Sequence, residues 1–206
     1  LTAQLSAQAA RTAWQDEAKR LENGFVIPEG TGIDDVFSII SAGLDIPVKD
    51  LEKAAEDPSS FGLPAEATTL EGFLFPATYT FEPGVSATEV LTRLVDRSLS
   101  ALDDAGVEPD KRWTTVILAS LIQREAGLAP DYPKVARVVL NRLDSELWPS
   151  GLLQSDATVA YGTGNTHTVT TTDEERADAS NEYNTYVHEG LPPAPISNPG
   201  DVAIKA

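Results

Sequence analysis

The chain has 206 residues, enough for one large domain or two small ones, and 41% of them are hydrophobic, as in an ordinary globular protein. Its 32 Asp and Glu residues outnumber its 15 Lys and Arg residues, which gives a net charge of −17. A field of that sign repels polyanions, so nucleic-acid binding is not expected. The chain has no Cys, which excludes disulfides, cysteine nucleophiles and thiolate metal sites.

The chain is expected to be a piece of a longer protein. It contains no Met, not even at position 1, and it opens with no signal peptide. No apolar run reaches the length of a membrane span. We therefore expect any anchor or targeting segment to lie outside this chain.

The first part of the chain predicts short elements of mixed type. The assignments follow from helical or alternating spacing of apolar residues and from the Gly and Pro residues that interrupt them. They are a helix over 1–20, a strand over 25–27, a helix from residue 34 and a helix over 47–57.

Residues 70–81 follow a different pattern. Most of them are apolar or aromatic, but Gly72 and Pro76 interrupt the run. This indicates two short strand pieces joined by a bend. The turn at Pro83-Gly84 suggests a soft domain boundary near 82–86.

Three helices are predicted next. Ser86 and Glu89 form a capping box at the start of a helix that runs to about residue 102. The segment 110–126 is almost continuously apolar in its middle, so we expect it to be buried on most sides. A third helix is expected over 131–147, and long loops rich in Gly, Thr, Asn and Pro follow it.

Glu125 lies where the apolar stripe of a predicted helix meets the helix C-terminus. It shares one helical face with Leu121 and Ile122. Apolar neighbours and the negative end of the helix dipole both favour the protonated carboxyl, the form that a general acid needs near neutral pH. The alternative is a frayed helix end, with Glu125 in solvent or paired with Arg124 or Arg142.

Six segments, spread over residues 25–206, together resemble one known family. They are Ile27-Pro28-Glu29-Gly30; Glu71-Gly72-Phe73-Leu74-Phe75-Pro76; Leu118 through Ala126; Lys134 through Leu143; Leu153-Gln154-Ser155-Asp156; and Tyr183-Asn184-Thr185-Tyr186 with the residues through Gly200. In this order they resemble the MltG/YceG-like family of endolytic murein transglycosylases. One such motif would be weak, whereas six in order are strong.

The resemblance implies an α+β fold, with a lysozyme-like helical catalytic region preceded by a small mixed α/β region. The expected division is a remnant of a LysM-like region or linker helix over 1–24, a small α/β subdomain over 25–83, and a C-terminally truncated catalytic region over 84–206. The family is anchored by an N-terminal membrane helix and faces the cell wall. The parent protein is therefore expected at the extracytoplasmic face of the cell membrane, held by an anchor missing from this chain.

The catalytic glutamate of the family matches Glu125. Many members carry a second Glu two positions earlier, where this chain has Gln123, so that competing candidate is absent. The resemblance also implies residues that line the sugar groove. They are Glu71, Gln154, Ser155, Asp156, Tyr183, Asn184 and Tyr186. Considered alone, Asp156 favours a structural role as a helix cap, and one of the two tyrosines is expected in the core.

The implied reaction cleaves the MurNAc-β-1,4-GlcNAc bond of nascent peptidoglycan strands without water. It leaves 1,6-anhydroMurNAc ends and terminates glycan elongation. Glu125 would protonate the leaving oxygen and then take the proton of the muramyl 6-hydroxyl as that oxygen closes on C1. No metal or cofactor is required.

The expected partners are peptidoglycan glycan strands, with cell-wall synthases as further candidates and the membrane reached only through the missing anchor. Two alternatives stay open. One is a hydrolytic muramidase in which Glu71 or Asp156 serves as a second carboxylate. The other is a non-catalytic cell-wall-binding module.

Overall fold

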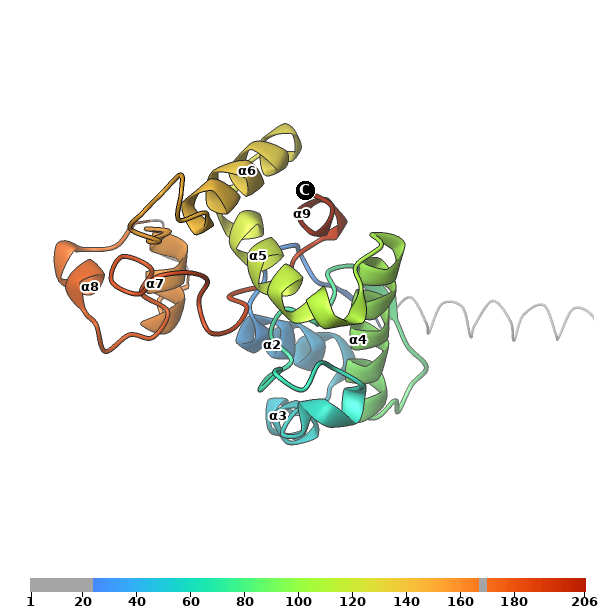
Figure 1. The fold of residues 1–206 in the computed structure, drawn as a ribbon. Coiled ribbons are helices and arrows are strands. Elements are labelled where there is room, and N and C mark those ends of the chain that lie inside the picture. Colours follow the sequence, from blue (N-terminus) through green and yellow to red (C-terminus); the bar gives the residue numbers. More distant parts are fainter. Residues whose placement is uncertain (1–23, 167–169) are drawn as a thin grey trace, which may run out of the picture.

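The computed structural model describes residues 24–166 and 170–206 (Figure 1), so the helix predicted over 1–20 lies outside the described residues. The fold is α+β, as predicted, with many helices and one small sheet. Within the described ranges no helix is both long and apolar enough to cross a membrane. The elements are β1 (Gly24–Val26), α2 (Ile33–Leu44), α3 (Val48–Ala54), the 3-10 turn η1 (Pro58–Phe61), β2 (Thr78–Thr80), α4 (Ala87–Asp104), η2 (Pro109–Lys111), α5 (Arg112–Glu125), η3 (Ala129–Asp131), α6 (Tyr132–Leu143), α7 (Asp156–Gly162), α8 (Asp173–Ala177) and α9 (Asp201–Ile204).

The sheet pairs β1 with β2 in antiparallel register, with Phe25 opposite Tyr79. The two rings lie 5.6 Å apart between centroids, and Phe25 also stacks on Phe81 at 5.9 Å. The Tyr79 hydroxyl donates to the Phe75 carbonyl oxygen at 2.8 Å, so this buried phenol is satisfied. Aromatic packing therefore supports a sheet that two three-residue strands could not hold alone.

The segment from Leu70 to Phe75 is a buried turn, so the first of the two predicted strand pieces is wrong. The Phe73 N–H donates to the Leu70 carbonyl oxygen at 3.0 Å, and Gly72 has φ 88°. A β-carbon on Gly72 would lie 2.6 Å from a methyl carbon of Val116, so this close approach requires glycine. Consecutive residues here are buried on all sides, which removes the alternation that a strand needs.

Helix α4 begins at the predicted capping box. The Ser86 hydroxyl accepts the Glu89 N–H at 3.3 Å, and the Glu89 carboxylate accepts the Ser86 N–H at 3.0 Å. One face of α4 is fully buried against α3 and α9. The buried residues of that face are Val90, Leu91, Leu94, Val95, Ser98, Ala101 and Leu102.

Helices α5 and α6 differ in how they are buried. Central α5 is enclosed, as predicted, and lies between α6 and α9 (Figure 1). Helix α6 ends at Leu143, four residues before the predicted end, because the chain turns at Asp144, whose carbonyl oxygen accepts the Trp148 N–H at 2.8 Å. The region after α6, predicted as long loops, contains the short helices α7, α8 and α9.

Asn198 joins three segments that are distant in sequence. Its side-chain oxygen accepts the Leu74 N–H at 2.7 Å. Its amide nitrogen donates to the Thr31 carbonyl oxygen and to Glu71 Oε1, both at 2.9 Å. The larger core cluster likewise includes residues on both sides of the boundary suggested near 82–86, so the two predicted regions pack on one shared core.

Candidate active site

A cavity of about 560 Å³ lies between the end of α5, one side of α6 and the segment that precedes α7. It combines apolar walls with a few charged and polar groups, the usual make-up of a ligand site. Its lining residues are Leu121, Glu125, Ala126, Gly127, Asp131, Lys134, Val135, Val138, Val139, Arg142, Leu153, Gln154 and Ser155.

Glu125 is the last residue of α5, and its exposed side chain lines this cavity. The Ser155 hydroxyl donates to Glu125 Oε1 at 2.5 Å. Arg124 and Arg142, the ion-pair partners considered from sequence, donate instead to backbone carbonyl groups. The apolar residue Leu121 borders the site one turn earlier, as predicted, but the carboxylate itself is open to water in the free protein.

The segment around Gln154 and Ser155 is held by Thr185. The Gln154 N–H donates to the Thr185 carbonyl oxygen at 3.0 Å, and the Ser155 N–H donates to its hydroxyl at 3.0 Å. Gln154 has φ 53°, a region that costs energy for a residue with a β-carbon and that concentrates at functional sites. Thr185 was not predicted as a site residue, because it supports the site through buried hydrogen bonds and does not line the cavity.

Ser155 is expected to position the Glu125 carboxylate. In Ser155→Ala the loss of one hydrogen bond to a charged group should lower kcat about tenfold and change KM little. Steady-state cleavage of purified glycan strands measures the split. The matched control is Ser150→Ala, because Ser150 is exposed on the same segment and does not line the cavity. A rise in KM with unchanged kcat would contradict the positioning role.

Asp156 is the centre of a polar cluster behind Ser155. Its carboxylate accepts two hydrogen bonds from the Arg176 guanidinium, at 3.0 and 3.1 Å, and one from the Thr171 hydroxyl at 2.6 Å. Burial acts to raise the pKa of Asp156, but the hydrogen bonds from Thr171, Arg176 and Tyr186 outweigh it and lower the pKa. Asp156 begins α7 without capping it, and its oxygens are occupied by these partners.

Replacing Asp156 by asparagine should destabilise the region of α7 and α8. The lowered pKa of Asp156 means that its stabilising contribution is present above the ordinary pKa of an aspartate and is lost as the pH falls through the folded value. We therefore expect Asp156→Asn to lower Tm by a few degrees at pH 7, with a smaller difference in acid. Asp173→Asn is the control, since Asp173 pairs with the same Arg176 but its side chain is 99% exposed. Equal effects of the two changes would contradict the assignment.

Tyr186 belongs to the polar cluster around Asp156. Its hydroxyl donates to Asp156 Oδ1 at 2.9 Å, and the Arg176 guanidinium lies 5.3 Å from its ring centroid. Burial, the hydrogen bond to Asp156 and the charge of Glu125 all contribute to raising the pKa of Tyr186. Tyr186 does not line the cavity of Glu125, and its hydrogen bond places it in the cluster around Asp156.

Asn184 and Tyr183 are placed differently from Tyr186. Asn184 is fully buried, and its amide nitrogen donates to the carbonyl oxygens of Glu175, Arg176 and Asp178. It can act on a substrate only by holding this segment. Tyr183 is half-buried against Tyr161, with 4.9 Å between ring centroids, and lines a different cavity.

That second cavity, of about 480 Å³, borders Glu71 as well as Tyr183. Glu71 has no exposed surface, and it accepts hydrogen bonds from the Ile33 N–H at 2.9 Å and the Tyr161 hydroxyl at 3.2 Å. Burial raises the pKa of Glu71 to about 7, although these hydrogen bonds lower it. The structure thus does not bring Glu71 into the cavity of Glu125.

Several residues that line the cavity were not predicted from the sequence. Asp131, Lys134, Val138 and Arg142 line the site from η3 and α6, and the i, i+4 spacing of the last three was a usable signal. Trp113 stacks on Phe73, with 6.3 Å between ring centroids. His188 is an exposed loop residue, and His167 lies outside the described residues.

Gln123, at the position where many family members have a second glutamate, has a bridging role. Its amide nitrogen donates to the Tyr132 hydroxyl at 2.6 Å, and its oxygen accepts the Gly200 N–H at 3.1 Å. It therefore ties α5 to the starts of α6 and α9. In residues 24–166 and 170–206 no group of three or more His, Asp or Glu side chains is arranged to hold a metal ion.

Fold and site together define a class: an α+β protein in which a buried helix ends in an exposed carboxylate within a cavity. The model of the YceG-like family matches residues 1–206, so the chain belongs to the YceG-like family. In structure it is similar to a YceG-like protein of Listeria monocytogenes solved at 2.6 Å, with a TM-score of 0.74 and 31% identity, over 89% of this chain and 64% of that one.

Curated relatives include proteins named endolytic murein transglycosylase. The one from Bacillus subtilis (strain 168) is 35% identical over 136 residues, which is 64% of this chain and 36% of the relative. The one from Streptococcus pneumoniae serotype 2 (strain D39 / NCTC 7466) is 30% identical over 149 residues, 66% of this chain and 25% of the relative. The chain thus spans roughly a third or less of the length of these relatives.

Proposed function

We propose that this chain is part of an endolytic lytic transglycosylase that cleaves peptidoglycan glycan strands. The relatives named above support the activity and the substrate class. The observation that carries the proposal is the arrangement around Glu125. Its carboxylate is exposed in a cavity large enough for saccharide units, and a buried serine hydroxyl holds one of its oxygens.

In the proposed reaction Glu125 acts first as acid and then as base. Its proton passes to the oxygen that links MurNAc C1 to GlcNAc, and the C1–O bond breaks. The muramyl 6-hydroxyl oxygen bonds to C1, and its proton returns to Glu125. No water is consumed, because the intramolecular hydroxyl has a high effective concentration, and the product carries a 1,6-anhydroMurNAc end.

The exposure of Glu125 in the free protein has a consequence for the proposed reaction. Glu125 is open to water here, whereas a general acid must hold its proton near neutral pH. A sugar bound against Leu121 and Val139 would exclude water from the carboxyl. In this proposal substrate binding completes the apolar surroundings expected from the sequence.

The main rival is a hydrolytic muramidase, which needs a second carboxylate to activate water. Both carboxylates considered from sequence are occupied: Asp156 by Arg176, and Glu71 by donors at the second cavity. Those two pairings favour the water-independent route. Asp131 also lines the cavity, and its exposed ion pair with Lys134 leaves it as the residue to examine if hydrolysis occurs.

We further propose that the parent protein works at the extracytoplasmic face of the cell membrane, on nascent strands near cell-wall synthases. The support is the substrate class alone, because murein lies outside the cytoplasmic membrane. Surface labelling of intact cells that carry the tagged parent protein tests the location, and a reporter found only inside the cytoplasm contradicts it.

Mass spectrometry of digested glycan strands tests the reaction. We expect ends one water lighter than hydrolysis products from the wild-type chain and none from Glu125→Gln. Reducing ends would establish a muramidase, and Asp131→Asn would then be compared. Binding of strands by both proteins, with no cleavage by either, would favour the cell-wall-binding module.

A further inference from the structure

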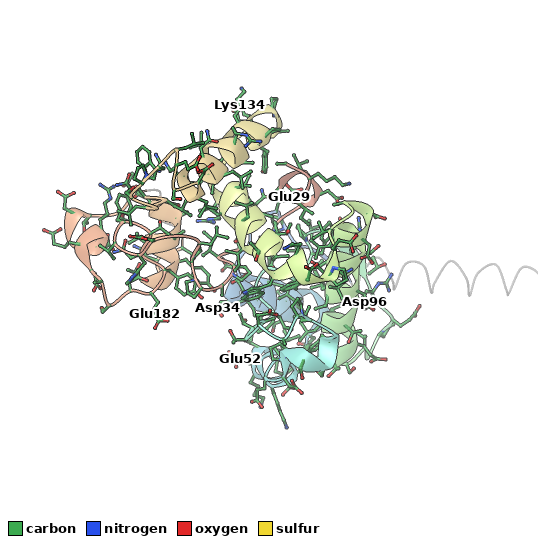
Figure 2. The ribbon with its side chains drawn as sticks, viewed as in Figure 1. Glu29, Asp34, Glu52, Asp96, Lys134 and Glu182 are labelled. Atoms are coloured by element: carbon green, nitrogen blue, oxygen red, sulfur yellow. The ribbon has the colours of Figure 1, made fainter. Side chains whose placement is uncertain are left out.

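Helix α6 is a cationic element in an acidic protein. Its 12 residues include Lys134, Arg137 and Arg142 and no Asp or Glu, although the chain has a net charge of −17. Lys134 and Arg142 line the cavity of Glu125, and Arg137 does not. The two lining cations are eight residues apart, about 12 Å along the helix. Figure 2 shows Lys134 at the outer end of α6, where the helix projects from the body.

Arg142 is held in place by two neighbours and keeps hydrogen-bond donors available to a ligand. One guanidinium nitrogen donates to the Leu153 carbonyl oxygen, and the group lies 5.4 Å from the ring centroid of Trp148. Trp148 is itself fixed, since its indole N–H donates to the Leu152 carbonyl oxygen at 3.1 Å. A guanidinium has five N–H donors, so donors remain for a ligand. A fixed arginine that borders a cavity is suited to bind a carboxylate through two hydrogen bonds.

Lys134 has a partner that a ligand can replace. It pairs with Asp131 at 2.9 Å, and the two side chains are 76% and 43% exposed. Exposed ion pairs of this kind contribute little stability because water screens them. An anionic group bound in the cavity can therefore take the place of Asp131 at the lysine.

We infer that Arg142 and Lys134 bind carboxylates of the peptide substituents on murein, so that the site selects glycan with free peptide carboxylates over glycan whose peptide carboxylates are amidated. This inference rests on the proposed function. Two cations beside one cavity attract anionic groups, and the acidic body of the protein repels such groups unless local positive charge offsets it. Val138, 51% exposed, lies one turn from each cation and offers an apolar contact to the peptide.

Binding to the inactive Glu125→Gln chain tests the inference without relying on turnover. Two strands of equal length are compared by calorimetry: strands with free peptide carboxylates and strands with those carboxylates amidated. We expect the free-carboxylate strand to bind about tenfold more tightly than the amidated strand. Amidation keeps the bulk of the peptide, so this comparison isolates charge.

Variants that each remove one positive charge from α6 identify the cations that bind the peptide carboxylates. Arg142→Gln keeps an amide that can donate to Leu153, and with Lys134→Gln it should bring the binding ratio close to one. Arg137→Gln removes the same charge from the same helix outside the cavity, and it should leave the ratio unchanged.

Three results would overturn the inference. They are equal binding of the two strands, no binding of either strand, and an equal loss of preference in Arg137→Gln, which would indicate only the general field of the helix. The proposed function fails separately, through the absence of anhydro ends in the product analysis of the wild-type chain. Equal cleavage of free-carboxylate and amidated strands with anhydro ends would keep the function and reject the selectivity.

Discussion

Replacing Glu125 by glutamine is expected to lower the rate of strand cleavage by about 10²- to 10⁴-fold, the usual contribution of a positioned acid or base. Glutamine keeps the size of the side chain and can still accept the hydrogen bond from Ser155, but it cannot give or take the proton. KM should change little, because the neutral amide preserves the shape of the cavity. Single-turnover cleavage of purified strands measures the loss.

The same substitution should leave folding intact. Glu125 is exposed and ends its helix, so the free energy of unfolding should change by less than about 0.5 kcal/mol in urea titrations. Glu66→Gln is a matched control, because Glu66 is also an exposed glutamate but lies outside the cavity. Activity of Glu125→Gln within tenfold of the wild type would remove Glu125 from the acid/base role and make Asp131 the next candidate.

Much of the fold could be predicted because its signals are local. The capping box at Ser86 and the apolar run before Glu125 fixed the starts and ends of long helices to within a few residues. Segments that depend on tertiary contacts were not predictable in this way. Leu70 and Phe73 have strand-like composition, yet packing of Gly72 against Val116 imposes a turn. Helices of four to seven residues after Ser155 likewise carry too little periodicity to detect.

The candidate site, like the fold, could be predicted only in part. Family motifs gave Glu125, Gln154 and Ser155, which the structure brings together at one cavity. The same motifs could not separate residues that line the cavity from residues that hold it. Asn184 lies in a matching segment, but it is buried and bonded to backbone carbonyl oxygens.

The cations of α6 are cavity residues that could not be predicted from the sequence. Arg142 and Lys134 lie in a recognised segment, yet only the structure places both on the wall that faces the cavity. Charge counts suggested no anionic partner, since the chain as a whole is acidic. A net charge describes the average field and says little about one helix, so a local anion site is compatible with −17 overall.

The second large effect is expected at Glu71, through the pH dependence of stability. Glu71 caps the N-terminus of α2, where its carboxylate accepts the Ile33 N–H. The N-cap residue, Gly32, has no side chain that could accept this hydrogen bond. Burial raises its pKa from 4.5 to about 7 in the folded state. Between those values the folded protein retains a proton that the unfolded chain has lost, so the contribution of Glu71 to stability is fully present below pH 4.5 and is lost as the pH rises through 7.

The change expected from this group is on the order of 3 kcal/mol between pH 4.5 and pH 8. Glu71→Gln should abolish it, because glutamine does not ionise in this range. The variant also turns an N–H₂ group toward donors such as the Asn198 amide, which costs about 1–3 kcal/mol. Glu71→Gln should therefore be less stable than wild type in acid, and the difference should shrink or reverse at pH 8.

Urea unfolding of wild type, Glu71→Gln and the control Glu66→Gln across this pH range measures the difference directly. Contributions of the other carboxylates, including Asp156, are common to all three chains and cancel in the comparison. Stability curves of wild type and Glu71→Gln that run parallel from pH 4.5 to pH 8 would mean that Glu71 stays ionised throughout. In that case its three donors, Ile33, Tyr161 and Asn198, would outweigh the cost of burying its charge.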